Sequence, residues 1–260
     1  MRAFGRAHTA FLPLALVAVM ATAPAGAQPR RSADPLRFLI WPAGDTRALA
    51  GSLASPRSLY ALGAGAALVW ASRYDETLTD KASDLADTPV LRVVEEFGNV
   101  KAVQPMAVVL FVGSLMSGDE RFQDAAFTSL EAVVFANLIT NGLKGAFGRA
   151  RPRQNHGPGA FRPFSGDTSF PSGHATTVFA LVTPWLFYYP HWTTAGLVVL
   201  AAGTAFSRMA TRAHWFTDVA AGAAVGFLTG YGLSRRHLRT GGPRIAPQFG
   251  YRSAGVRVRF

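Results

Sequence analysis

The stretch PSGHATTVFALVTPWLFYY, residues 171–189, decides the fold class. From Ala175 to Tyr189 it carries no charged side chain, and its apolar residues do not alternate with polar ones. A run of this length and pattern is too long for an ordinary strand and favours a helix. Ser172 stands where such a helix begins, and serine is a common residue at that position.

Apolar blocks of the same kind recur along the chain. They cover residues 59–71, 102–116, 125–143, 175–189, 192–206 and 219–233. We predict a helix in each block and hence an all-α fold, a six-helix bundle. At roughly 22 Å, most of these helices are marginal for a bilayer whose hydrocarbon is roughly 30 Å thick. Gly222, Gly226 and Gly230, spaced four residues apart, nevertheless favour close helix contacts of the membrane type, and we expect a membrane-embedded or membrane-associated bundle.

The composition narrows the classes of function. The chain has 260 residues, a net charge of +11 and no cysteine, which excludes disulfides, thiolate zinc sites and cysteine nucleophiles. Hydrophobic residues make up 49% of the chain and charged residues 16%, which argues against disorder and for a membrane as a neighbour. The positive charge suits nucleic acid, anionic lipid or a phosphorylated substrate, and composition alone does not choose among them.

The sequence divides into four segments. Residues 1–27 combine two arginines, an apolar stretch and a final run of small residues, which is typical of a bacterial secretory signal. An uncleaved membrane anchor has the same N-terminal pattern. Residues 28–57 form a polar lead-in with one short amphipathic helix, and residues 58–235 form the main domain. Residues 236–260 are a basic tail whose alternating residues predict a β-hairpin between residues 245–251 and 256–260. Export argues against nucleic acid as the partner.

Two polar clusters flank the loop between the third and fourth blocks. Lys144 and Arg151 follow the third block, and alone they indicate no more than a solvated basic cap. Ser172, Gly173 and His174 open the fourth block. Glycine lets an anion approach the backbone, and the free N–H groups at a helix start attract phosphate. The alternative is an ordinary capped helix start with a histidine in its first turn.

A third cluster joins the fifth and sixth blocks, where Arg208 is followed by His214 and, four residues later, by Asp218. Asp218 can accept a hydrogen bond from one ring nitrogen of His214 and leave the other nitrogen unprotonated, as a nucleophile or base. The alternative is a surface pair of little energetic weight. An up-and-down bundle brings all three clusters to one side, where so much positive charge suits a phosphoryl group.

Together these residues resemble a known signature. Lys144 to Pro152, Pro171 to His174 and Ser207 to Asp218 are similar to the three-part signature of the type 2 phosphatidic acid phosphatase superfamily, which also contains bacterial acid phosphatases and vanadium haloperoxidases. The resemblance implies that His214 attacks phosphorus and forms a phosphohistidine, with Asp218 holding its tautomer. His174 would protonate the leaving oxygen and then activate water. The groups that would hold the phosphoryl oxygens are Lys144, Arg151, Ser172, Gly173 and Arg208.

The resemblance further implies a metal-independent phosphatase with no cofactor, although vanadate would fit the same cradle. Activity should follow a bell-shaped pH profile, because one histidine must be neutral and the other protonated. We expect lipid phosphates such as phosphatidate or polyprenyl pyrophosphate as substrates. The alternatives are a periplasmic acid phosphatase acting on small phosphomonoesters, a vanadate-dependent haloperoxidase, and a membrane structural protein with a vestigial site.

The expected location is the bacterial cell envelope, at a membrane, with the site facing the periplasm. A cleaved signal followed by six spans would instead place the site in the cytoplasm. Either residues 1–27 remain attached, or some of the six blocks do not span the bilayer.

Overall fold

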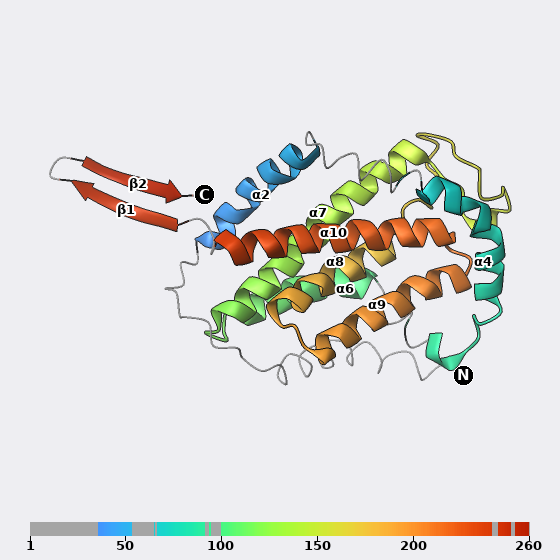
Figure 1. The fold of residues 1–260 in the computed structure, drawn as a ribbon, viewed down its shortest axis with the longest axis horizontal. Helices are drawn as coiled ribbons and strands as arrows, with labels where there is room; N and C mark the ends of the chain where they lie inside the picture. The colour runs from blue at the N-terminus through green and yellow to red at the C-terminus, as the bar shows by residue number, and fades with distance from the viewer. Residues whose placement is uncertain are drawn as a thin grey trace.

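A computed structural model describes residues 36–53, 65, 67–91, 94, 100–240, 244–250 and 253–259. Within these ranges the chain is a helical bundle followed by one two-stranded hairpin (Figure 1). The longer helices are α2 (Arg37–Leu53), α4 (Asp75–Ser83), α6 (Val100–Ser114), α7 (Glu120–Phe147), α8 (Gly173–Tyr188), α9 (Trp192–Ala210) and α10 (Phe216–Thr240). The all-α fold predicted for the main domain is confirmed.

Helices α6 to α10 correspond to the last five of the six apolar blocks, whereas most of the first block lies outside the described residues. Helix α7 is longer than its apolar block because Asp119 and Gly148, both outside the block, set its two ends. At the start, the Asp119 carboxylate accepts hydrogen bonds from the N–H groups of Arg121 and Phe122 at 2.9 and 3.2 Å. At the other end Gly148 adopts φ 52°, a left-handed conformation that terminates helices.

Helix α8 lies at the centre of the bundle and packs against α6, α7, α9 and α10. Figure 1 shows α10 running along α8. The two helices approach closely because glycines face α8: a Cβ at Gly222 or Gly226 would overlap the carbonyl oxygen of Ser172 or Thr176. The spacing of these glycines in the sequence therefore predicted a real helix contact.

Two helices outside the apolar blocks complete the bundle. Helix α2 is the short helix predicted in the lead-in, and the Arg37 guanidinium ties it to α7 through Asp124 at 2.8 Å. Helix α4 was not predicted, because it lies between the first two apolar blocks and consists mainly of charged and polar residues. Its first residue, Asp75, is completely buried.

The tail forms an antiparallel hairpin of β1 (Arg244–Gly250) and β2 (Ser253–Arg259), in which Gly250 pairs with Ser253 and Arg244 with Arg259. The alternation in the tail predicted this hairpin. The signal or anchor expected at residues 1–27 lies outside the described residues. Among the described helices α7 alone is long and apolar enough to cross a membrane, judged by length and composition, and half of its apolar stretch is buried within the bundle.

Candidate active site

The structure brings the three sequence clusters together at one end of the bundle, where α7 and α9 end and α8 and α10 begin. The backbone N–H of Ser172 donates to the carbonyl of Asp218 at 2.9 Å, which joins the second cluster to the third. A Cβ at Gly173 would lie 3.8 Å from Cε of Lys144, which places the first cluster beside the second. Within the third cluster, the N–H of His214 donates to the carbonyl of Arg208 at 3.1 Å.

His214 is buried and held in one tautomer. Its Nδ1 lies 2.7 Å from the backbone carbonyl oxygen of Ser169. A carbonyl can only accept, so Nδ1 carries the proton and Nε2 keeps its lone pair. The ring is 2% exposed, and this burial lowers the pKa of His214 below that of an ordinary histidine. His214 is therefore a neutral imidazole with one nitrogen available for attack.

Asp218 does not make the contact with His214 that the spacing predicted. Its nearer carboxylate oxygen lies 3.7 Å from Nδ1, too far for a hydrogen bond. That oxygen instead accepts from the Ser169 hydroxyl at 2.5 Å and from the Trp215 N–H at 2.9 Å. Asp218 therefore orients His214 indirectly, by fixing the residue whose carbonyl binds the ring. At 3.7 Å its charge still favours a positive imidazole.

A buried ion pair that the sequence analysis missed supports Asp218. Arg149 is fully buried and donates from Nη1 to Asp218 Oδ1 and from Nη2 to Asp75 Oδ2, both at 2.6 Å. Asp75 in turn accepts from the N–H and the hydroxyl of Thr217 at 2.8 and 2.7 Å. Arg149 lay inside a basic run that reads as solvated, and no spacing in the sequence links it to Asp75, 74 residues earlier.

The candidate phosphate ligands surround this core. Lys144 Nζ donates to the carbonyl of Thr168 at 2.5 Å, and Arg151 Nη2 to the Thr168 hydroxyl at 3.3 Å, so one loop residue aligns both cations. Ser172 occupies the N-cap position of α8, but its side chain makes no capping bond, contrary to expectation. Its buried hydroxyl has no hydrogen-bond partner among the described residues and is available to a ligand.

His174 lies in the first turn of α8, within a strongly positive environment. Burial and the charges of Arg208, Arg151 and Lys144 lower the pKa of His174 to about 4. The free protein thus presents a neutral His174 surrounded by cations. Because a bound phosphoryl dianion would cancel much of that positive charge, it would raise this pKa and favour the protonated form.

Aromatic side chains anchor the loop that joins α7 to α8. The Phe170 ring lies 4.9 Å from that of Phe147 and 6.5 Å from that of Phe161, measured between centroids. Phe164 is 85% exposed. Phe161 and Phe170 thus hold the loop that carries Arg151 and Thr168, while Phe164 projects from it.

A comparison with known protein families identifies the family of one segment of the chain. Residues 125–241 match the model of the PAP2 superfamily. This segment belongs to the PAP2 superfamily. It contains every residue of the three clusters as well as Arg149, whereas Asp75 and the helices α2 and α4 lie before it.

Individual relatives match parts of the chain. A lipid A 1-phosphatase of Rhizobium johnstonii is 42% identical over 99 residues, which are 36% of this chain and 40% of the relative. A lipid A 1-phosphatase of Porphyromonas gingivalis is 40% identical over 96 residues, 35% of this chain and 19% of the relative. The matches thus span less than half of either relative.

A solved structure shows the same fold over more of the chain. The transmembrane PAP2-type phosphatidylglycerolphosphate phosphatase of Bacillus subtilis superposes with a TM-score of 0.50 at 20% identity. The match covers 79% of this chain and 94% of that structure. The PAP2 fold therefore extends beyond the segment recognised from sequence.

Proposed function

We propose that this protein is a phosphatase that hydrolyses phosphate monoesters or diphosphates, with lipid phosphates as its substrates, through a phosphohistidine on His214. The observation that carries the proposal is the tautomer of His214. The Ser169 carbonyl binds the protonated Nδ1, which leaves Nε2 as a nucleophile among cationic side chains.

In the first step, Nε2 of His214 attacks phosphorus, and the bond from phosphorus to the leaving oxygen breaks. His174, protonated when the phosphoryl dianion binds, gives its proton to that oxygen. His214 becomes positively charged, and Asp218 at 3.7 Å stabilises that charge while Nδ1–H keeps its bond to Ser169.

In the second step, water attacks phosphorus and the bond between phosphorus and Nε2 breaks. The now neutral His174 accepts the proton of the attacking water, so both histidines return to their starting states. The roles of His174 as acid and then as base are the two halves of one cycle.

Fixed positive charge stabilises the transition state in both steps. Phosphoryl transfer depends mainly on positioning and charge, and the N–H groups that begin α8 add to the cations. We assign the binding of the phosphoryl oxygens to Lys144, Arg151, Ser172, Gly173 and Arg208. These donors require no metal for hydrolysis, and vanadate would occupy the same cradle.

Lipid substrates are favoured over small phosphomonoesters by three observations. Both matched relatives described above are named lipid A 1-phosphatases. Helix α7, whose last turn carries Lys144, is long and apolar enough to cross a membrane. Phe164 exposes an aromatic ring on the loop that carries Arg151. We place the protein at the membrane of the bacterial envelope, with the site facing the periplasm.

The test is phosphate release by detergent-purified protein from phosphatidate, a lipid diphosphate and p-nitrophenyl phosphate. We expect release that is faster from the lipids and unaffected by EDTA during a short assay. His214→Ala should abolish it, whereas His156→Ala, a change in the exposed part of the loop, should not. Equal release by His214→Ala would refute the assignment of the nucleophile, and faster release from p-nitrophenyl phosphate than from the lipids would refute the lipid assignment.

A further inference from the structure

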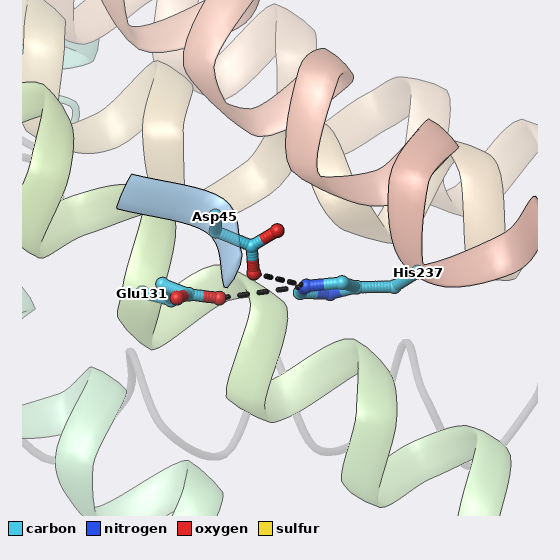
Figure 2. Close-up of side chains that lie close together, drawn as sticks. All are labelled: Asp45, Glu131 and His237. Carbon is cyan, nitrogen blue, oxygen red and sulfur yellow. Dashed lines mark hydrogen bonds and ion pairs between the residues drawn. The ribbon is translucent and has the colours of Figure 1, made fainter. Parts of the chain in front are cut away.

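Three ionisable side chains from three different helices meet at the other end of the bundle from the candidate active site. Figure 2 shows Asp45 of α2, Glu131 of α7 and His237 of α10 pointing toward one another. His237 Nε2 lies 2.8 Å from Asp45 Oδ2 and 3.6 Å from Glu131 Oε2. All three side chains are buried, and one donor atom from each lies within 4.8 Å of the others.

The hydrogen bonds of His237 fix where its lone pair points. Thr128 donates its hydroxyl proton to the carbonyl of Asp124 at 2.6 Å, so its oxygen can only accept from His237 Nδ1, 2.8 Å away. Nδ1 therefore carries a proton, and Nε2 faces the two carboxylates. A neutral His237 would direct a lone pair at Asp45, which requires either a proton or a metal cation between them.

Glu131 makes the need for a cation stronger. The residue is 6% exposed, and neither carboxylate oxygen has a hydrogen-bond partner among the described residues. A proton on Nε2 would satisfy Asp45 at 2.8 Å, but Glu131 at 3.6 Å lies beyond hydrogen-bond range. A buried carboxylate without a hydrogen-bond partner is costly, and the Glu131 carboxylate points into the cluster (Figure 2).

We propose that Asp45, Glu131 and His237 bind a divalent transition-metal ion of the zinc class. One imidazole nitrogen and two carboxylates form a donor set that suits zinc and its neighbours, and a bidentate Glu131 would supply a fourth donor. Thr128 fixes the tautomer that a metal-binding histidine needs. Arg236 pairs with the other oxygen of Asp45, so Oδ2 is the oxygen that faces the ion.

This ion would be structural. His237 follows Asp218 by 19 residues on one helix, about 28 Å, and Glu131 precedes Lys144 by 13 residues, about 20 Å. Its ligands belong to α2, α7 and α10, and the Trp41 ring of α2 stacks on His237 with centroids 3.8 Å apart. The ion would thus fasten α2 to the bundle and take no part in phosphoryl transfer.

Metal analysis of the full chain, purified without a histidine tag, tests the proposal. After equilibration with Zn²⁺ and removal of the excess, the wild type should retain about one equivalent. Glu131→Gln and His237→Gln should retain less than about a tenth of that amount. The matched controls Glu76→Gln and His156→Gln change exposed residues and should retain the wild-type amount.

A chelator titration tests the site without any substitution. EDTA or dipicolinate during slow heating should lower the Tm of the wild type by about 5 °C or more, and excess Zn²⁺ should restore it. Folded Glu131→Gln should show no chelator effect. A wild type that binds less than about 0.1 equivalent of Zn²⁺, and whose Tm is the same with and without chelator, would overturn the proposal and identify a cluster held by ion pairs and hydrogen bonds alone.

Discussion

At the scale of single residues, the reactivity that we propose for His214 depends on groups that lie behind its ring and have no proposed contact with the phosphoryl group. Asp218 acts on the ring through Ser169, and Arg149 and Asp75 hold Asp218 in place. The side chains of Asp218, Arg149 and Asp75 are all fully buried, so the charge of each must be compensated by its neighbours. The orientation of the proposed nucleophile therefore rests on α4, a helix outside the PAP2 segment.

Asp75→Asn should lower kcat by about 10- to 100-fold with little change in KM, because it disturbs the orientation of His214 but removes no phosphate ligand. Steady-state kinetics on a soluble substrate, with Tm measured in parallel, checks this expectation. Asp80→Asn is the matched control: it lies on the same helix, is half exposed and pairs with Arg212 at the surface. A kcat for Asp75→Asn within twofold of the wild type would show that α4 does not support catalysis.

The pH dependence should differ between kcat/KM and kcat. In the free protein the pKa of His174 is lowered to about 4, whereas in the complex the phosphoryl dianion raises it. The alkaline limb of kcat, which reports the complex, should therefore lie at higher pH than that of kcat/KM, which reports the free enzyme. Profiles from about pH 3 to 9 measure both limbs. Coincident limbs, or an alkaline limb of kcat that survives in His174→Ala, would contradict the role of His174.

The acid limb belongs to His214 in this account. Attack needs the neutral ring, and burial lowers the pKa of His214. Activity should therefore persist below the pH at which an ordinary histidine, with pKa about 6.5, becomes protonated. An acid limb centred at about pH 6.5 or above would be inconsistent with a buried His214.

Much of the site could be predicted from the sequence, because helix ends and short spacings bring its residues together. His174, His214 and Lys144 come from segments whose order in a bundle places them on one side. The supporting groups could not be predicted. Nothing in the sequence distinguishes Arg149 from the other arginines of its basic run. The Ser169 carbonyl belongs to the backbone, so no residue type marks it in the sequence.

At the scale of elements, the contact between α8 and α10 places the candidate phosphate cradle. Gly222 faces the carbonyl of Ser172, and Gly226 that of Thr176, one turn further along. There is no room for a side chain at either glycine. A larger residue there would push the two helices apart and so move the start of α8. Helix packing and the geometry of the cradle are therefore coupled.

Gly226→Ala should destabilise the protein by about 1–3 kcal/mol, because the added methyl group must push apart two well-packed helices. Gly232→Ala on the same helix is the control, since no atom lies within 4 Å of its Cβ position, and it should be neutral or slightly stabilising. Thermal unfolding in detergent compares the two variants. Equal Tm values would argue against a tight contact.

The sequence predicted those helices whose burial requires long runs of apolar residues. Helices α6 to α10 are apolar enough to be recognised, and the glycines of α10 mark its contact face. Helix α4 is nine residues long and rich in charged and polar residues, and it is stabilised by tertiary bonds such as those of Asp75. Contacts between residues far apart in the sequence leave no periodic signal, so such a helix escapes prediction.

At the scale of the whole molecule, the two ends of the bundle differ in charge and in the roles that we propose for them. One end gathers cations around the histidines, and the other encloses Asp45 and Glu131 with His237. An oxyanion should therefore bind at the first end, and a metal cation at the second. Each ligand should stabilise the fold independently of the other, because the sites are more than about 20 Å apart.

Vanadate should inhibit competitively and raise the Tm of the wild type by a few degrees. The Tm shift should disappear in Arg208→Ala, which removes a candidate phosphate ligand. It should persist in Arg235→Ala, which removes an arginine that pairs with Tyr231 toward the other end of α10. Thermal shift with and without vanadate makes the comparison. An equal shift in both variants would place the anion elsewhere.

The most direct test of the central claim is to trap the phosphoryl group on the protein. With ³²P-labelled p-nitrophenyl phosphate and rapid quenching, the wild type should carry a label that is stable in alkali and lost in acid, as expected of phosphohistidine. His174→Ala should accumulate more label, because nitrophenolate leaves without an acid while water attack lacks its base. His214→Ala should carry none. Equal labelling of His214→Ala, or nitrophenol release by His174→Ala without any labelled protein, would contradict a phosphohistidine at His214.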